Sequence, residues 1–315
     1  MVPSDLVSLP PVVLLVGATG TGKTGFALNW AQRFPLEIVN LDASQFYLGM
    51  DIGTAKPEAA EQALVPHHLF DIANPDEPLD AGQYLALADE VAKTVSGRGK
   101  VPLFVGGTGL YSRALRNGLA EIPAIPKSVR TQLMTELEKR GVHALHAELV
   151  TVDPDAAARL SPNDPQRITR ALEVYRHTGT TISYFQQAHR FARPRYNALV
   201  LGLDMAIDIL RPRVEARVLQ MFQSGFIAEA QRLLEAGYSP DLRTFKALGY
   251  RDVFAHLAGE LSLDETRERL VRHHLRYAKR QRTWFSRDDS IHWFTHETAD
   301  SANQLLARFL GLQDR

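Results

Sequence analysis

An eight-residue segment near the start of the chain has the composition of a phosphate-binding loop. Residues 17–24 read Gly-Ala-Thr-Gly-Thr-Gly-Lys-Thr, which matches the pattern G-x-x-x-x-G-K-[ST]. In such a loop the backbone N–H groups point at phosphate oxygens, the lysine neutralises phosphate charge, and the last hydroxyl binds Mg²⁺. We therefore expect a diphosphate or nucleotide site with Thr24 as the metal ligand, formed by Gly17, Ala18, Thr19, Gly20, Thr21, Gly22, Lys23 and Thr24.

The neighbouring residues predict the elements that must position this loop. Residues 12–16 are a short apolar run, typical of a parallel strand covered on both faces, and residues 24–33 have apolar side chains at helical spacing. Further strands are predicted at 37–41, 101–105 and 197–203, and a helix at 81–95. After the strand at 197–203 we expect helices beginning near Asp208, Ile227 and Leu263 and continuing to the end of the chain. The alternation predicts an α/β fold, a doubly wound parallel sheet like that of P-loop NTPases.

Two more polar residues are predicted at the same edge of this sheet. Asp42 follows the second strand, and Thr108 lies between glycines after the third. Ligands of parallel α/β sheets bind at the carboxyl ends of strands, so Asp42 is a candidate general base or metal partner. The alternatives are a turn-capping carboxylate for Asp42 and an ordinary strand-to-helix turn for Thr108.

The composition of the chain restricts which covalent links, metal sites and membrane contacts it could have. The chain has no cysteine, which excludes disulfides and thiolate-bound zinc and fits a reducing, cytoplasmic location. The early apolar run is too short to span a bilayer, so no membrane association is expected. His67 and His68 are adjacent on a predicted strand, where their side chains point to opposite faces, so a structural role is favoured over metal binding.

The middle of the chain differs from the rest. Residues 117–197 show no strand pattern and contain predicted helices over 128–140, from 155 and from 165. The simplest domain organisation is a core of residues 1–116 and 198–315 with a helical insertion at 117–197.

A basic segment follows near the C-terminus. Whole-chain charge gives no sign of a nucleic-acid partner, because 36 basic residues balance 36 acidic ones, but eight basic residues lie between Arg267 and Arg287. They recur three or four positions apart, as on one face of a helix. The face is either an ordinary solvated surface or a contact with a phosphate backbone.

Seven ordered groups of residues resemble the tRNA dimethylallyltransferase (isopentenyl transferase) family, in its bacterial form. The phosphate loop alone would not identify it. The groups are residues 42–47, residues 49–57, His67 and His68 with Asp71, residues 106–111, residues 163–173, residues 247–250, and residues 277–284.

The resemblance implies a reaction and roles for individual residues. Dimethylallyl diphosphate would occupy the phosphate loop with Mg²⁺, and N6 of adenosine 37 of a tRNA would attack its allylic carbon, releasing diphosphate. Asp42 would be the base and Thr108 would lie beside the reacting atoms, with Arg251 as a further anion contact.

The resemblance also implies contacts with the anticodon stem-loop of tRNA, by an enzyme expected to act as a monomer. The adenosine would be extruded into a channel and read by polar groups. The implied tRNA-binding residues are Asp42, Ala43, Ser44, Gln45, Thr108, Arg130, Gln166, Arg167, Ile168, Thr169, Arg170, Arg276, Lys279 and Arg280.

The chain departs from the family pattern at a few positions. Ala43 replaces the usual serine, Leu48 an arginine, and His274-Leu275 a Thr-Arg pair. Because these changes leave the loop and the base intact, we expect altered substrate affinity and retained activity.

Three other functions are compatible with parts of this pattern. A small-molecule or nucleoside kinase would use the same loop for ATP and transfer a phosphoryl group. A non-catalytic RNA-binding module would bind RNA without forming a product. An enzyme that prenylates free adenine nucleotides would leave the insertion without a purpose.

Overall fold

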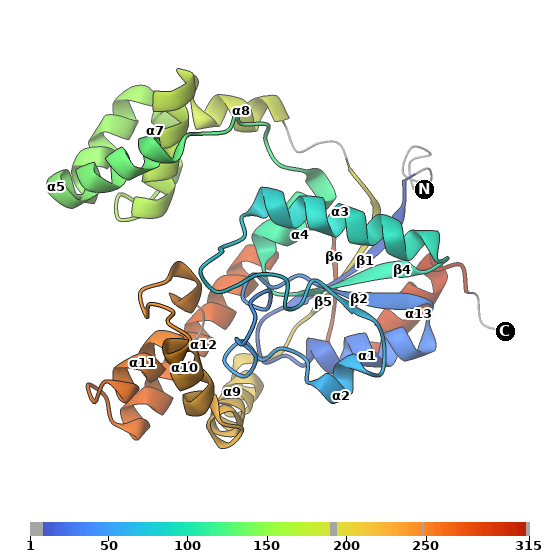
Figure 1. Cartoon of the computed structure of the whole chain (residues 1–315). Helices are drawn as coiled ribbons and strands as arrows, with labels where there is room; N and C mark the ends of the chain where they lie inside the picture. Colours follow the sequence, from blue (N-terminus) through green and yellow to red (C-terminus); the bar gives the residue numbers. More distant parts are fainter. Residues whose placement is uncertain (1–8, 190–193, 247–248, 313–315) are drawn as a thin grey trace. The chain divides into compact units, whose positions relative to one another are not determined.

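The chain forms two compact units, which we call the core unit and the helical unit. A computed structural model describes residues 9–189, 194–246 and 249–312 (Figure 1). The core unit comprises the described residues up to Arg116 and from Arg195 onward, and the helical unit comprises Asn117–Pro194. The second boundary lies three residues before the expected one, because the Arg195 N–H already donates to the Arg116 carbonyl at 2.8 Å.

A six-stranded parallel sheet forms the centre of the core unit. Its strand order is β3-β2-β4-β1-β5-β6, and every neighbouring pair is parallel. The predicted fold class is confirmed. The strands are β1 Pro11–Gly17, β2 Leu36–Asn40, β3 His67–His68, β4 Val101–Gly106, β5 Asn197–Leu203 and β6 Ile291–Phe294.

Helices cover both faces of the sheet, and alternate residues of β1 show how. Val13 and Leu15 pack in a cluster with α1 and α13, whereas Leu14 and Val16 pack in a cluster with α3, α4 and α9 to α12. The helices are α1 Lys23–Arg33, α2 Ala59–Gln62, α3 Ala81–Gly97, α4 Gly109–Asn117, α9 Ile207–Gln223, α10 Phe226–Glu235, α11 Tyr250–Leu257, α12 Leu263–Phe285 and α13 Ala299–Phe309. None of the described helices is long and apolar enough to cross a membrane.

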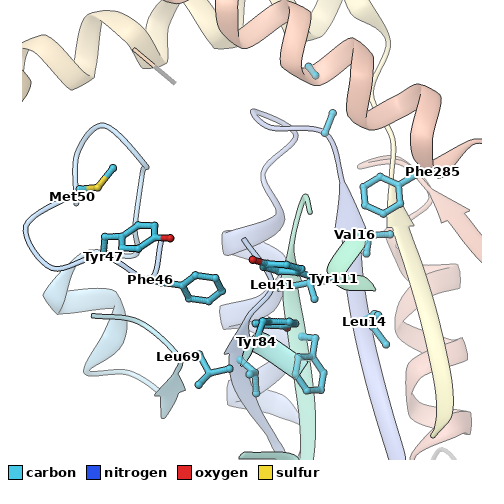
Figure 2. Close-up of a cluster of buried hydrophobic side chains, with 14 of the residues drawn as sticks. Leu14, Val16, Leu41, Phe46, Tyr47, Met50, Leu69, Tyr84, Tyr111 and Phe285 are labelled. Carbon is cyan, nitrogen blue, oxygen red and sulfur yellow. The ribbon is translucent and has the colours of Figure 1, made fainter. Parts of the chain in front are cut away.

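Aromatic side chains fix the segment that follows β2. Figure 2 shows Phe46 beside Tyr84 and Tyr111, and the two tyrosine rings stack with centroids 4.2 Å apart. The Tyr84 hydroxyl donates to the carbonyl of Asn40, the last residue of β2, at 3.1 Å. These aromatic contacts therefore fix the position of the chain at the end of β2, just before Asp42.

The helical unit has its own small core. It contains α5 Lys127–Val152, α6 Pro154–Arg159, α7 Pro165–Thr178 and α8 Ile182–His189. Leu133, Leu145 and Ile168 are fully buried within it, and α5 is interrupted at Gly141, whose φ is 76°. The described part of this unit contains no strand, as predicted.

The structure corrects one expectation about the C-terminal part. Instead of continuous helices it contains the strand β6, which pairs with β5 at one edge of the sheet. Only the terminal residues of β6, Ile291 and Phe294, are buried, so its apolar pattern is too short to distinguish it from a loop.

Candidate functional site

The phosphate loop connects β1 to α1, as predicted. The Lys23 ammonium donates to the carbonyls of Gly17 at 3.0 Å and Ala18 at 2.8 Å, so it lies across its own loop. Burial lowers the pKa of Lys23 to about 8, although the charge of the nearby Asp42 carboxylate acts in the opposite direction. An anion on the loop amides would meet a cation that is partly stripped of water.

Gln281 of α12 joins this loop to the one after β4. Its side-chain oxygen accepts from the Thr19 N–H at 2.8 Å, and its amide nitrogen donates to the Gly107 carbonyl at 3.0 Å. A Cβ at residue 107 would lie 1.9 Å from that nitrogen, so the contact requires glycine. Gln281 thus fixes the spacing between the phosphate loop and the loop that carries Thr108.

Asp42 is half-buried at the end of β2, and short hydrogen bonds hold it. The Ser44 N–H and hydroxyl donate to Oδ1 of Asp42 at 3.0 and 2.6 Å. The Asp42 N–H donates to the side-chain oxygen of Asn40 at 2.8 Å. Oδ2 has no hydrogen bond from the described residues.

Thr108 contacts the residues on both sides of Asp42, and its N–H donates to the Leu41 carbonyl at 3.3 Å. Its hydroxyl accepts from the Ala43 N–H at 3.0 Å, and the Tyr277 hydroxyl of α12 lies near it. Burial raises the pKa of the Tyr277 phenol, and the Asp42 charge adds to the shift, so Tyr277 stays protonated. The structure therefore brings Lys23, Asp42 and Thr108 together with Tyr277.

Arg217 completes this group, which we call the acid–cation cluster. It lies on α9, and its charge acts on both Lys23 and Asp42. Burial lowers the pKa of the Arg217 guanidinium, while Asp42 opposes that shift. Arg217 was not among the predicted site residues, because nothing in the local sequence of α9 sets it apart from the other arginines of that helix.

A buried glutamate anchors the chain after Asp42. Glu229 of α10 accepts the N–H groups of Asp51, Ile52 and Gly53 at 2.7–3.1 Å, and the Tyr250 hydroxyl at 2.6 Å. This explains why the motifs at residues 49–57 and 247–250 occur together, although Ala247 and Leu248 lie outside the described residues.

Lys56 anchors the same segment from the other side. Its ammonium is buried and contacts the carboxylates of Asp51 and Asp71 at 2.5 and 2.6 Å, as well as the Tyr47 carbonyl at 2.9 Å. Lys56 and the two carboxylates that it contacts are therefore part of the scaffold. Gln45 likewise uses its amide to donate to the carbonyls of Thr54 and Ala55.

Arg251, predicted as an anion contact, does not join the acid–cation cluster. Its guanidinium is exposed on the first turn of α11 and donates to the Asp241 carbonyl at 3.4 Å. Tyr250 next to it is buried and bound to Glu229, so this turn belongs to the scaffold around residues 51–53.

In the helical unit, the structure separates exposed candidates from buried ones. Arg130, Gln166, Arg167 and Arg170 are surface residues. Ile168 is fully buried in the helical core, and the Thr169 hydroxyl donates to the Pro165 carbonyl of its own helix at 2.7 Å. Their side chains are therefore unavailable to RNA, and these two expectations are wrong.

The basic helix α12 is only partly neutralised. Arg282 pairs with Asp204 at 3.2 Å and Arg269 approaches Asp252 at 4.0 Å. Arg276, Lys279 and Arg280 are exposed, and none of them has an acidic partner within ion-pair distance among the described residues. The Arg280 guanidinium lies 5.5 Å from the centre of the Tyr277 ring.

The surroundings of His67, His68 and Thr24 bear on the question of metal binding. His68 lies 2.7 Å from the Glu37 carboxylate and His67 Nδ1 lies 2.8 Å from the Val65 carbonyl, which supports a structural role. Among the described residues there is no group of three histidines or carboxylates that could hold a metal. Mg²⁺ bound through a diphosphate needs only one or two protein oxygens, however, and the half-buried Thr24 in the first turn of α1 fits that requirement.

Known families match the chain over most of its length. Residues 45–288 match the family model described as IPP transferase, and residues 10–71 match the one described as isopentenyl transferase. The chain belongs to the IPP transferase family. Among curated relatives of this family member, a tRNA dimethylallyltransferase of Geobacter sulfurreducens is 46% identical over 95% of the chain and 97% of the relative. One from Syntrophobacter fumaroxidans is 48% identical over 95% of the chain and 87% of the relative.

Solved structures agree with this assignment. The tRNA isopentenylpyrophosphate transferase of Bacillus halodurans is 35% identical, with a TM-score of 0.71 over 96% of this family member and 97% of that chain. A eukaryotic dimethylallyltransferase acting on tRNA, 24% identical, shares the fold with a TM-score of 0.78 over 95% of this chain and 80% of its own.

Two departures of this family member have a structural explanation. Ala43 lacks a hydroxyl, but Ser44 supplies one directly to Asp42. His274 is buried, with Nδ1 at 2.9 Å from the Leu270 carbonyl, and burial lowers its pKa to about 4, so it is a neutral packing residue at pH 7.

Proposed function

We propose that the chain transfers a dimethylallyl group from dimethylallyl diphosphate to N6 of adenosine 37 in tRNA. The observation that carries the proposal is the acid–cation cluster, in which Lys23 lies across the phosphate loop and both Lys23 and Arg217 are within electrostatic range of one carboxylate, Asp42. A site with this composition can bind a diphosphate and accept a proton in the same place.

The residues of the cluster account for each part of the reaction. N6 of the adenine forms a bond to C1 of the dimethylallyl group while the bond from C1 to the diphosphate oxygen breaks. The bonding pair leaves with the diphosphate, whose charge Lys23, Arg217 and the loop amides stabilise. The amine proton passes to Asp42, and Ser44 holds the accepting carboxylate in place. A Mg²⁺ ion held by Thr24 would add positive charge next to the leaving diphosphate.

Thr108 and Tyr277 form the wall next to the reacting atoms. The Thr108 hydroxyl oxygen accepts from the Ala43 N–H, which fixes its position beside Asp42. A fixed hydroxyl beside Asp42 suits the reading of an extruded base, whose edge carries both donors and acceptors.

We further propose that surface residues of both units bind the tRNA. Arg130, Gln166, Arg167 and Arg170 supply the helical unit's contacts, and Arg276, Lys279 and Arg280 those of α12. These side chains would contact phosphates and position the anticodon stem-loop without reading its sequence. This distribution accounts for RNA binding by a chain whose formal net charge is zero.

The product of the reaction tests the proposal. The purified protein is incubated with Mg²⁺, dimethylallyl diphosphate and an unmodified tRNA that carries adenosine 37, and the digested RNA is analysed by mass spectrometry. Dimethylallyl-adenosine is expected. ATP hydrolysis without this product would support the kinase, and RNA binding without any product would support the RNA-binding module.

A further inference from the structure

A basic groove lies on the core unit beside α12, and no residue of the acid–cation cluster lines it. Its volume is about 810 Å³. The residues that line it come from α9, from α12 and from the carboxyl ends of β5 and β6: Asp204, Ile207, Arg211, Leu275, Arg276, Lys279, Arg282, Thr283, Ser286 and Trp293. The helix thus uses Tyr277 and Gln281 in the catalytic site and Arg276 and Lys279 in the groove.

The groove carries an excess of positive charge. Arg211, Arg276, Lys279 and Arg282 contribute four cations against the single carboxylate of Asp204, a difference of +3. Asp204 is already paired with Arg282 at 3.2 Å, and Arg211 is 3.9 Å from the exposed Glu215. The charge of Arg276 and Lys279 therefore stays available to an anion that enters the groove.

An aromatic side chain forms the wall at β6. Trp293 is 42% exposed, and its ring lies against Gly202 of β5. A Cβ at residue 202 would come within 2.6 Å of a ring carbon, so the missing side chain makes the seat for the indole. An aromatic ring held on a sheet edge beside unpaired cations has the features of a stacking platform for a nucleic-acid base.

We infer that this groove binds an unpaired nucleotide of the RNA substrate, with its base stacked on Trp293 and its phosphate on Arg276 and Lys279. The inference rests on the proposed function, because it requires RNA as the substrate. Two features favour an unpaired nucleotide over a duplex backbone. The indole offers a flat surface to a base, and the hydroxyl oxygens of Thr283 and Ser286, whose protons go to carbonyls of α12, can accept hydrogen bonds from a sugar or base edge.

Substitution of Trp293 tests the stacking contact. Stacking one base is worth a roughly five- to hundredfold change in affinity, so Trp293→Ala should weaken binding of a synthetic anticodon stem-loop RNA by that factor. The dependence of affinity on salt should not change, because no charge is removed. Trp293→Phe keeps a ring and should bind nearly normally, while losing the part of the RNA-induced fluorescence quenching that comes from Trp293 and keeping the part that comes from the exposed Trp284.

Removal of the cations should change the salt dependence of RNA binding, which Trp293→Ala leaves unaltered. Arg276→Ala with Lys279→Ala should reduce the slope of log affinity against log salt by about 0.7 for each phosphate that the variant no longer neutralises. Unaltered RNA affinity in folded Trp293→Ala would overturn the inference. If that variant does not fold, an unaltered slope in the double variant together with unchanged quenching in Trp293→Phe would overturn it.

Two further measurements distinguish this inference from a small-anion site and from the proposed function. Quenching of Trp293 by dimethylallyl diphosphate alone, and not by the RNA, would make the groove a small-anion site and contradict the inference. RNA binding that depends on Trp293 in a protein that forms no prenylated product would uphold the groove and contradict the proposed function. If the unsubstituted protein binds no stem-loop RNA, both are wrong.

Discussion

Ser44 donates its hydroxyl to Oδ1 of Asp42 over 2.6 Å, and so fixes one oxygen of the carboxylate while the other stays available to the substrate. The same oxygen also accepts the Ser44 N–H at 3.0 Å. The proposed base is therefore held by its own turn, in a chain where Ala43 cannot contribute a hydroxyl.

The first prediction concerns this hydrogen bond. Ser44→Ala should reduce kcat about fivefold, since one side-chain hydrogen bond contributes about 1 kcal/mol and the backbone N–H contact remains. The KM for dimethylallyl diphosphate should stay unchanged, because Ser44 does not contact the phosphate loop. Ser44→Thr, which keeps the hydroxyl, is the matched control; an equal loss in both variants would show that bulk and packing, not the hydroxyl, matter.

The second prediction concerns the charge of Lys23. Its pKa in the free protein is lowered to about 8, so its proton is present below that pH and lost as the pH rises through it. Calorimetric titration with dimethylallyl diphosphate should show weaker binding at about pH 9 than at about pH 7. Lys23→Ala should bind weakly at both values, without the break. Equal affinity of the unsubstituted protein at both pH values would count against a contact between Lys23 and dimethylallyl diphosphate.

Arg217 provides the third prediction. Arg217→Ala should raise the KM for dimethylallyl diphosphate roughly ten- to hundredfold, the range expected when a charge-assisted hydrogen bond is removed. The KM for tRNA should change little. Arg232→Ala, on the exposed surface of α10, removes the same charge and serves as the control. A rise in the tRNA KM alone would place Arg217 among the RNA contacts.

The fourth prediction concerns stability. Glu229→Gln replaces an oxygen that accepts backbone N–H groups with an amide that cannot, and should lower the free energy of unfolding by about 2–4 kcal/mol. Tyr250→Phe removes only one hydrogen bond to the same carboxylate and should cost about 1 kcal/mol. Urea denaturation measures both. Equal losses would contradict the view that the three N–H contacts dominate.

Local sequence patterns were enough to predict where the phosphate loop, Asp42 and Thr108 lie in the fold. Each follows a strand with a recognisable apolar run, and parallel strands bring their carboxyl ends to one edge. Arg217 and Gln281 reach the same place from helices, and only tertiary packing decides which of several polar residues on a helix face inward.

The errors have a similar origin. Gln166–Arg170 form a continuous stretch of the motif, but an α-helix has 3.6 residues per turn, so Ile168 and Thr169 face the helical core while their neighbours face outward. Arg251 follows a motif that anchors Glu229, and its position in the sequence says nothing of its distance from Asp42. The strand β6 was missed because its two central residues are His292 and Trp293, which are exposed.

The most direct test of the central claim is the turnover of Asp42→Ala with saturating tRNA and dimethylallyl diphosphate, measured beside tRNA binding. If Asp42 is the base, kcat falls by roughly 10²–10⁴ while the tRNA dissociation constant is unchanged, and Asp42→Asn behaves in the same way. Unchanged turnover in a folded variant, or a loss explained entirely by weaker tRNA binding, would contradict the account.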